Sequence, residues 1–167
     1  MSNGPYAFLS GEIIPLADAK VGIQTHALHY GTAAFEGIRG NWNEDHGKIY
    51  IFRLKEHYER LIRGCKILQM DLPYSADQYV DITVELLQRN GYREDVYIRP
   101  LAFKSQQLVA NLNLNALESD FGLIIIPFGS YIDNDRAIRC QTSSWRRPDD
   151  TIMPTGVKLA GLYTTSI

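Results

Sequence analysis

The sequence predicts an α+β domain, because hairpin-like apolar runs come first, two helical segments follow, and more apolar runs come after them. Short apolar runs bounded by glycine, proline and polar turn residues are typical of strands. The two central segments instead repeat apolar residues at spacings of three and four, which is typical of amphipathic helices. This order of hairpins, helices and further strands gives the mixed fold class.

Two hairpins are expected in the first third of the chain. The first covers residues 6–16, where apolar runs flank Ser10 and Gly11. The second covers residues 37–53, with a polar loop over 41–47 and a returning strand over 48–53. The segment HALHYGTAAFEGIRG (residues 26–40), which runs into the start of the second hairpin, has the composition of a strand with its turns. Its glycines beside large polar and aromatic groups suit a surface where backbone approaches a small ligand.

The clearest helix is expected over residues 54–70, ended by Asp-Leu-Pro at 71–73. One apolar stripe contains Leu54, Tyr58, Leu61, Ile62, Cys65 and Leu68. A second helix is expected over residues 76–90. Ser75 and Gln78 have capping-box spacing at its start, and Gly91 suits the position after its end.

Strands are expected again over residues 95–104, 121–128 and 137–145. We expect a small α+β domain over residues 1–127 and a connector over 128–136. Residues 137–167 would then begin a larger, incomplete second domain. Because the chain stops at Ile167, inside a segment resembling the opening of a helix, we expect a fragment or a protein whose remainder lies elsewhere.

Composition argues against several classes of protein. Of 167 residues, 45% are hydrophobic and 22% charged, and the net charge is −2, so nucleic-acid binding and membrane attraction are not expected. Cys65 and Cys140 have no disulfide or metal-ligand spacing, so we expect buried thiols in a reduced cytoplasm. The opening residues lack the pattern of a secretory leader.

Three basic residues are candidates for chemistry. Lys158 stands among small apolar residues, which disfavour its charged form and suit a nucleophile. For a lysine taken alone, a place at a helix start with its amine in solvent is the more common role. Arg60 lies off the apolar stripe and suits a phosphate or solvent. Strand alternation puts Tyr97 and Arg99 on one face, which suits a carboxylate ligand or a surface ion pair.

Three blocks in order, HALHYGTAAFEGIRG, YIRPL (97–101) and MPTGVKLAGLY (153–163), resemble the fold-type IV pyridoxal-phosphate aminotransferases. They are most similar to the branched-chain amino acid aminotransferases. The resemblance implies the small N-terminal domain of the D-amino acid aminotransferase-like fold plus the start of the larger domain. It covers the whole chain, yet only about the first half of a typical member.

The resemblance also implies roles for individual residues. Lys158 would be the catalytic Schiff-base residue for pyridoxal 5'-phosphate. Arg60, in a segment similar to the family's His-x-x-Arg-Leu element, would hold the phosphate, and Tyr163 would contact the cofactor. The substrate-binding residues would be Tyr30, Phe35, Gly37, Tyr97, Arg99, Phe128 and Tyr131. His57, Glu36 and Arg39 are expected to be structural, and no metal is expected.

The implied activity is transamination between branched-chain L-amino acids and 2-oxoglutarate. The implied assembly is a homodimer or higher homo-oligomer, with amino acids and 2-oxo acids as its small-molecule partners. Alternatives are a D-amino acid or (R)-amine transaminase, an aminodeoxychorismate lyase, or a non-catalytic dimerising fragment. Because the residue that pairs with the cofactor's pyridinium nitrogen follows the lysine in this family, the 167-residue chain alone is expected to be inactive.

Overall fold

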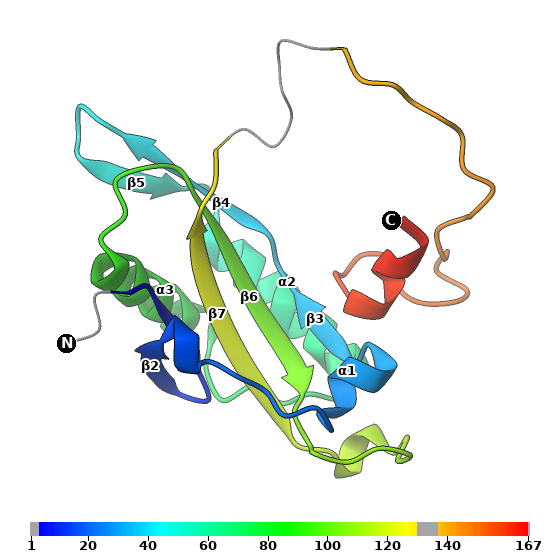
Figure 1. Ribbon diagram of the computed structural model, residues 1–167. Coiled ribbons are helices and arrows are strands. Elements are labelled where there is room, and N and C mark those ends of the chain that lie inside the picture. The colour runs from blue at the N-terminus through cyan, green and yellow to red at the C-terminus, as the bar shows by residue number, and fades with distance from the viewer. Residues whose placement is uncertain (1–3, 130–136, 167) are drawn as a thin grey trace.

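An antiparallel sheet with two long helices against it forms the body of the computed structural model, which describes residues 4–129 and 137–166 (Figure 1). Within these residues the sheet has seven strands in the order β2-β1-β7-β6-β4-β5, and β3 pairs with β6 off this path. The strands are β1 (Tyr6–Leu9), β2 (Glu12–Pro15), β3 (Ala33–Phe35), β4 (Ile38–Asn43), β5 (Lys48–Ile51), β6 (Val96–Lys104) and β7 (Ser119–Pro127). The helices are α1 (His26–Tyr30), α2 (Leu54–Ile67) and α3 (Ala76–Asn90), with short 3-10 turns η1 (Leu16–Asp18), η2 (Leu114–Ala116) and η3 (Ala160–Ser166).

The two central strands, β6 and β7, present one buried face and one more open face. Val96, Ile98 and Ala102 of β6 are fully buried in the core, while Tyr97 and Arg99 alternate with them on the opposite face. The helices α2 and α3 pack together on the buried face through an apolar stripe that includes Tyr58. The open face of β6 therefore remains free to carry polar side chains.

Both long helices confirm the predictions from periodicity. α3 covers the predicted residues, and its capping box joins the Ser75 side chain to Gln78 and Gln78 back to Ser75. Gly91 ends it in the left-handed conformation at φ 66°. α2 ends at Ile67, three residues before the predicted end, because Gln69 adopts φ 52° and breaks the helical path.

Both predicted hairpins are present as β1–β2 and β4–β5, the second returning strand ending at Ile51. The segment 26–40, however, is not only strand and turns. Residues 26–30 form the short helix α1, which Gly31 ends at φ 64° with its N–H bonded to the Ala27 carbonyl. One helical turn gives too little periodicity to distinguish it from a strand in the sequence.

The strand expected over residues 137–145 is wrong. These residues form neither helix nor strand and are exposed throughout. A strand is stabilised by hydrogen bonds to a neighbouring strand, and none of the described strands pairs with this segment. Cys140 is consequently exposed, which corrects the expectation of a buried thiol there, whereas Cys65 is buried as expected. No helix among the described residues is both long and apolar enough to span a membrane.

Candidate active site

The C-terminal segment turns back and lies beside β3 and α1, which brings Lys158 to the sheet (Figure 1). The N–H of Phe35 donates to the Lys158 carbonyl over 3.0 Å, and Ala34 forms an isolated antiparallel bridge with Leu159. Leu159 is buried in the core. The backbone around Lys158 is therefore held as a short extension of the pairing made by β3.

Two glycines permit this close docking. At Gly31, an added Cβ would lie 3.0 Å from the Cα of Gly161, so the two backbones meet where neither carries a side chain. At Gly64, on α2, the position of an added Cβ is 3.4 Å from the Cβ of Val157. Glycines at the end of α1 and on α2 thus set how near the lysine segment approaches.

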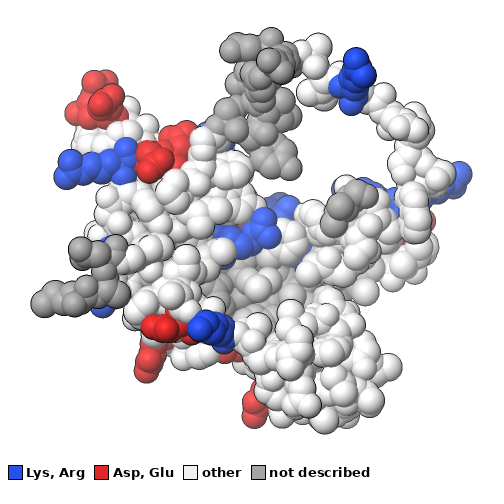
Figure 2. Space-filling view, viewed as in Figure 1, with Lys and Arg blue, Asp and Glu red and all other residues white. Residues whose placement is uncertain are grey.

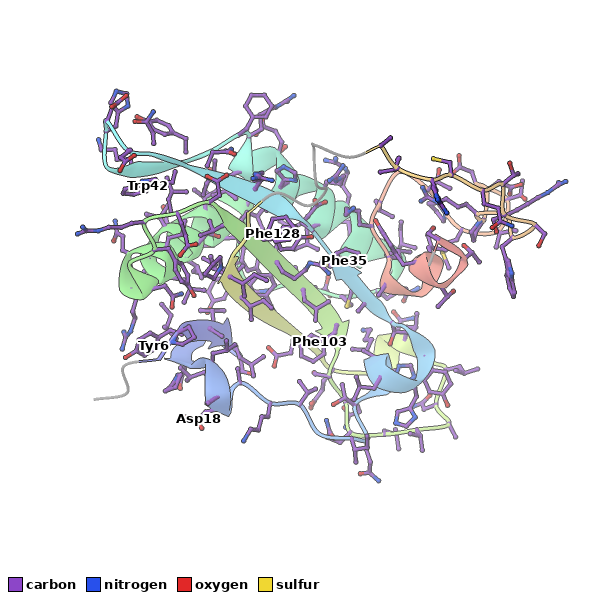
Figure 3. The ribbon with its side chains drawn as sticks, turned by 45° about the horizontal axis from the view of Figure 1, so that its top comes forward. Tyr6, Asp18, Phe35, Trp42, Phe103 and Phe128 are labelled. Carbon is purple, nitrogen blue, oxygen red and sulfur yellow. The ribbon has the colours of Figure 1, made fainter. Side chains whose placement is uncertain are left out.

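The Lys158 amine lies between two aromatic rings. Its Nζ donates to the Tyr163 hydroxyl over 2.7 Å, and it is 5.3 Å from the ring centroids of both Phe35 and Tyr163. The two rings are themselves 4.9 Å apart. Figure 3 shows Phe35 on β3, between β6 and the C-terminal segment. The amine is thereby held beside a phenol to which it donates a hydrogen bond.

A second basic group, Arg60, is held by a buried carboxylate. Its Nε and Nη2 donate to Oε1 and Oε2 of Glu36, each over 2.6 Å, and the Glu36 side chain is only 1% exposed. The Nδ1 of His57 lies 3.0 Å from Glu36 Oε2, which confirms His57 as a histidine hydrogen-bonded within the fold. Burial acts to raise the pKa of Glu36, but the hydrogen bonds and charges of Arg60 and His57 outweigh it and lower that pKa.

A third basic group, Arg99, lies on the open face of β6. Its Nη2 donates to the Tyr97 hydroxyl over 2.6 Å, and its guanidinium carbon is 4.5 Å from the Phe35 ring centroid. The predicted shared face of Tyr97 and Arg99 is confirmed. The buried Nε of Arg99 has no hydrogen-bond partner among the described residues. Arg99 therefore has an unused N–H donor, and it lies beside the Phe35 ring, which also contacts Lys158.

Aromatic residues form the wall next to Arg99. The Phe128 ring lies 5.1 Å from the Tyr97 ring, and the Phe128 N–H donates to the Asp95 carbonyl. The space beside the Gly37 Cα is filled by the Tyr97 phenol, so a Cβ at residue 37 would collide with its hydroxyl. Gly37 thus admits the tyrosine that holds Arg99. Tyr131 lies outside the described residues.

Tyr30 lies in a different environment from Phe35. Its ring stacks on His26 at 4.4 Å, and its hydroxyl accepts from the Ala110 N–H over 2.9 Å. It lines an adjacent cavity of about 450 Å³. That cavity is mostly apolar and includes Leu159, Gly161 and Leu162 but not the Lys158 side chain. The structure thus brings Lys158, Phe35, Tyr163, Arg99 and Tyr97 together and puts Tyr30 on the other side of the lysine segment.

Charged side chains are spread over the visible face of the molecule (Figure 2). In Figure 2, one group of Lys and Arg atoms lies near the middle of the visible face, while other Lys and Arg atoms lie at the edges together with the Asp and Glu atoms. The site residue that sequence reasoning assigned only to the scaffold is Glu36, the buried partner of Arg60. Its signal was present in the sequence, since an acid within the apolar run AAFEG needs a buried partner.

The fold and this lysine-centred site define the class of protein as a fold-type IV enzyme. The chain matches a family model described as amino-transferase class IV over residues 33–165, and it belongs to that family.

The named relatives agree with one another. The chain is 46% identical over 162 residues to a probable branched-chain-amino-acid aminotransferase of Aquifex aeolicus, a match that covers 96% of this chain and 51% of that protein. It is 32% identical to the branched-chain-amino-acid aminotransferase of Escherichia coli K12, covering 97% of this chain and 52% of the relative. The chain thus spans about half the length of these relatives.

Solved structures give the same result. A branched-chain aminotransferase of Thermoproteus uzoniensis with norvaline matches with a TM-score of 0.90 at 36% identity, covering 98% of this chain and 54% of that one. The branched-chain amino acid aminotransferase of Escherichia coli matches with a TM-score of 0.85 at 31% identity, covering 98% and 54%. A further branched-chain amino acid aminotransferase, complexed with N-(5'-phosphopyridoxyl)-L-glutamate, matches with a TM-score of 0.83 at 33% identity, covering 99% and 54%. At these identities the likeness extends to the sequence as well as the fold.

Proposed function

We propose that the protein carrying this chain is a pyridoxal-phosphate-dependent aminotransferase that moves the amino group of leucine, isoleucine or valine to 2-oxoglutarate. The observation that carries the proposal is the Lys158 amine, which donates to the Tyr163 hydroxyl over 2.7 Å beside Phe35. The names of the relatives support the branched-chain substrates.

The residues present fit pyridoxal 5'-phosphate. Lys158 offers an amine for its aldehyde, Tyr163 a phenol for its ring oxygen, and Arg60 a guanidinium for its phosphate. When bound, this cofactor supplies an electron sink for the negative charge that develops at the substrate Cα.

The protein's own groups then handle the protons. Lys158 Nζ takes the proton from the substrate Cα and later returns one, which requires an amine that can be held and released in place. The Tyr163 hydroxyl holds Nζ at 2.7 Å, and the Phe35 ring limits access of water to the same side. Positioning therefore comes from two aromatic residues, one on β3 and one on η3.

Two kinds of substrate side chain must share one pocket. The rings of Phe35, Tyr97 and Phe128 offer apolar contact for a branched side chain. Arg99 offers a charge for the carboxylate of glutamate, and its bond to Tyr97 gives it a partner while an apolar substrate is bound. We assign Gly37 to the same pocket through its contact with Tyr97. Tyr30 and Tyr131 are proposed as substrate-binding residues on the family resemblance alone.

The same proposal includes the domain organisation and the assembly of the whole protein. Residues 1–127 form the small domain, residues 128–136 connect, and residues from 137 onward begin the larger domain, whose remaining residues complete the cofactor site. Such a protein is a homodimer of the cytoplasm, as the resemblance implies. The relatives are about twice the length of this chain, which is consistent with a longer polypeptide.

Borohydride reduction of the cofactor-loaded complete polypeptide, followed by peptide mapping, tests the proposal directly. We expect the pyridoxyl label on Lys158 and none on Lys158→Ala. Lys55→Ala is the matched control, since Lys55 is an exposed lysine paired with Asp77, and it should keep the label. A folded protein with no label on Lys158 contradicts the proposal. Amino transfer from D-alanine rather than L-leucine would instead favour the D-amino acid alternative.

A further inference from the structure

We propose that Glu36 is the positioning residue for phosphate recognition: it fixes the guanidinium of Arg60 so that one edge faces the cofactor phosphate. The inference rests on the proposed function and assigns the buried carboxylate that the chemistry above leaves unused. It makes Glu36 the determinant of selectivity for a phosphorylated cofactor over its unphosphorylated form.

The geometry around Glu36 is asymmetric. The Glu36 side chain is 1% exposed, while the side chain of Arg60 is 38% exposed. Both carboxylate oxygens are used, Oε1 by Arg60 Nε and Oε2 by Arg60 Nη2 and His57 Nδ1. The carboxylate is thus the fixed, buried end of the pair, and the arginine reaches from it towards solvent.

The backbone at residue 36 is equally fixed. The Glu36 N–H donates to the Pro100 carbonyl of β6 over 3.0 Å, and the neighbouring Phe35 N–H donates to the Lys158 carbonyl over 3.0 Å. Two consecutive residues therefore set the place of the arginine and the place of the lysine. A shift of one would displace both ends of the cofactor site together.

The pairing with Glu36 uses one edge of the Arg60 guanidinium and leaves its far end available for a second ligand. A guanidinium has five N–H groups in a planar fork, and Glu36 takes the edge formed by Nε and Nη2. The end formed by Nη1 and the second N–H of Nη2 has no partner among residues 4–129 and 137–166. That end can make a second two-bond contact, which is the geometry a phosphate accepts.

Net charge cannot be what Glu36 contributes. A carboxylate beside Arg60 reduces its attraction for an anion, so a site built on charge alone would omit it. Arginine has a long side chain with large rotamer entropy, and two short bonds to a buried carboxylate remove most of it before the phosphate binds. Orientation is therefore the gain, and the loss of Glu36 should weaken phosphate binding despite the added positive charge.

The test compares pyridoxal 5'-phosphate with pyridoxal on the cofactor-free complete polypeptide, by titration of protein fluorescence. For Glu36→Gln we expect the dissociation constant for the phosphorylated form to rise about tenfold, as for loss of a charged hydrogen bond. The dissociation constant for pyridoxal should change less than twofold. Glu56→Gln is the matched control: Glu56 lies on the same helix as Arg60 and binds Arg53, away from Glu36, and neither constant should change.

Two results overturn the inference: equal weakening for both ligands, which indicates a merely structural role, or no weakening for either. If Glu36→Gln does not fold, Glu36→Asp keeps the charge but is one methylene short of a two-bond contact, and the same selective loss is expected. Arg60→Lys separates this from the proposed function. If Arg60→Lys leaves the preference for phosphate intact, the phosphate assignment itself is wrong; if it abolishes the preference while Glu36→Gln does not, only the role of Glu36 is wrong.

Discussion

Arg60 and Arg99 are both half-buried arginines assigned to anionic groups, yet their surroundings differ. Arg60 is paired with a buried carboxylate through two bonds of 2.6 Å. Arg99 bonds to a neutral phenol, lies over the Phe35 ring, and has a buried Nε without a partner among the described residues. A permanent ligand suits a neutralised and pre-oriented arginine, whereas a carboxylate that enters in only one half-reaction suits an arginine whose charge remains uncompensated.

The largest effect is expected when the charge of Arg99 is removed, because this tests whether Arg99 binds only the substrate carboxylate. In Arg99→Met, kcat/KM for 2-oxoglutarate should fall about 100-fold, because the substrate carboxylate loses its half-buried charge partner. The value for L-leucine should stay within about threefold, since methionine keeps an apolar wall. Steady-state kinetics of the two half-reactions measure the split.

Arg89→Met is the control for this split. Arg89 lies in the last turn of α3, over the Tyr6 ring at 4.7 Å and away from the open face of β6, so its loss should affect neither half-reaction. An equal fall for leucine and 2-oxoglutarate in Arg99→Met would contradict the assignment of Arg99 to the carboxylate.

A smaller effect is expected at Tyr97. Tyr97→Phe removes the acceptor that holds Arg99 Nη2 and keeps the ring that contacts Phe128. Loss of one such hydrogen bond costs about 1–1.5 kcal/mol, so kcat/KM for 2-oxoglutarate should fall about tenfold with leucine unaffected. Tyr50→Phe, which removes an exposed phenol bonded to His46, is the matched control. An unchanged 2-oxoglutarate value would show that Arg99 needs no orientation by Tyr97.

At Arg60 the comparison predicts a pH effect on stability. The pKa of Glu36 is lowered in the folded protein from its ordinary value of 4.5, so its contribution is present above pH 4.5 and is lost as pH falls through the folded pKa. The free-energy difference between wild type and Glu36→Gln should therefore be largest near pH 7 and shrink below pH 4.5. Urea unfolding of both proteins at pH 7 and below pH 4.5 measures this free-energy difference. A difference that stays constant with pH would contradict a charged Glu36 at neutral pH.

Sequence reasoning succeeded where the determining interactions are local. The capping box of α3 joins residues three apart, and the shared face of Tyr97 and Arg99 follows from the two-residue period of a strand. It failed for α1, a single turn ended by Gly31, and for residues 137–145, whose strand would need a partner that the described chain does not provide. Glu36 was undervalued because its partners lie 21 and 24 residues further along, on α2.

The last prediction tests the docking of the lysine segment, and its two variants should change the free energy of unfolding in opposite directions. Gly64→Ala should stabilise the protein by about 0.5–1 kcal/mol, because alanine favours the helix and its Cβ would meet Val157 at an ordinary 3.4 Å. Gly31→Ala should destabilise it by about 1–2 kcal/mol, since residue 31 has φ 64° and its Cβ would press on Gly161 at 3.0 Å. Thermal unfolding of the complete polypeptide measures both. Docking through Gly31 places Lys158 relative to Phe35, so Gly31→Ala should also weaken cofactor binding, whereas Gly64→Ala should not. If both variants changed the stability in the same direction, the lysine segment would not dock against these two glycines.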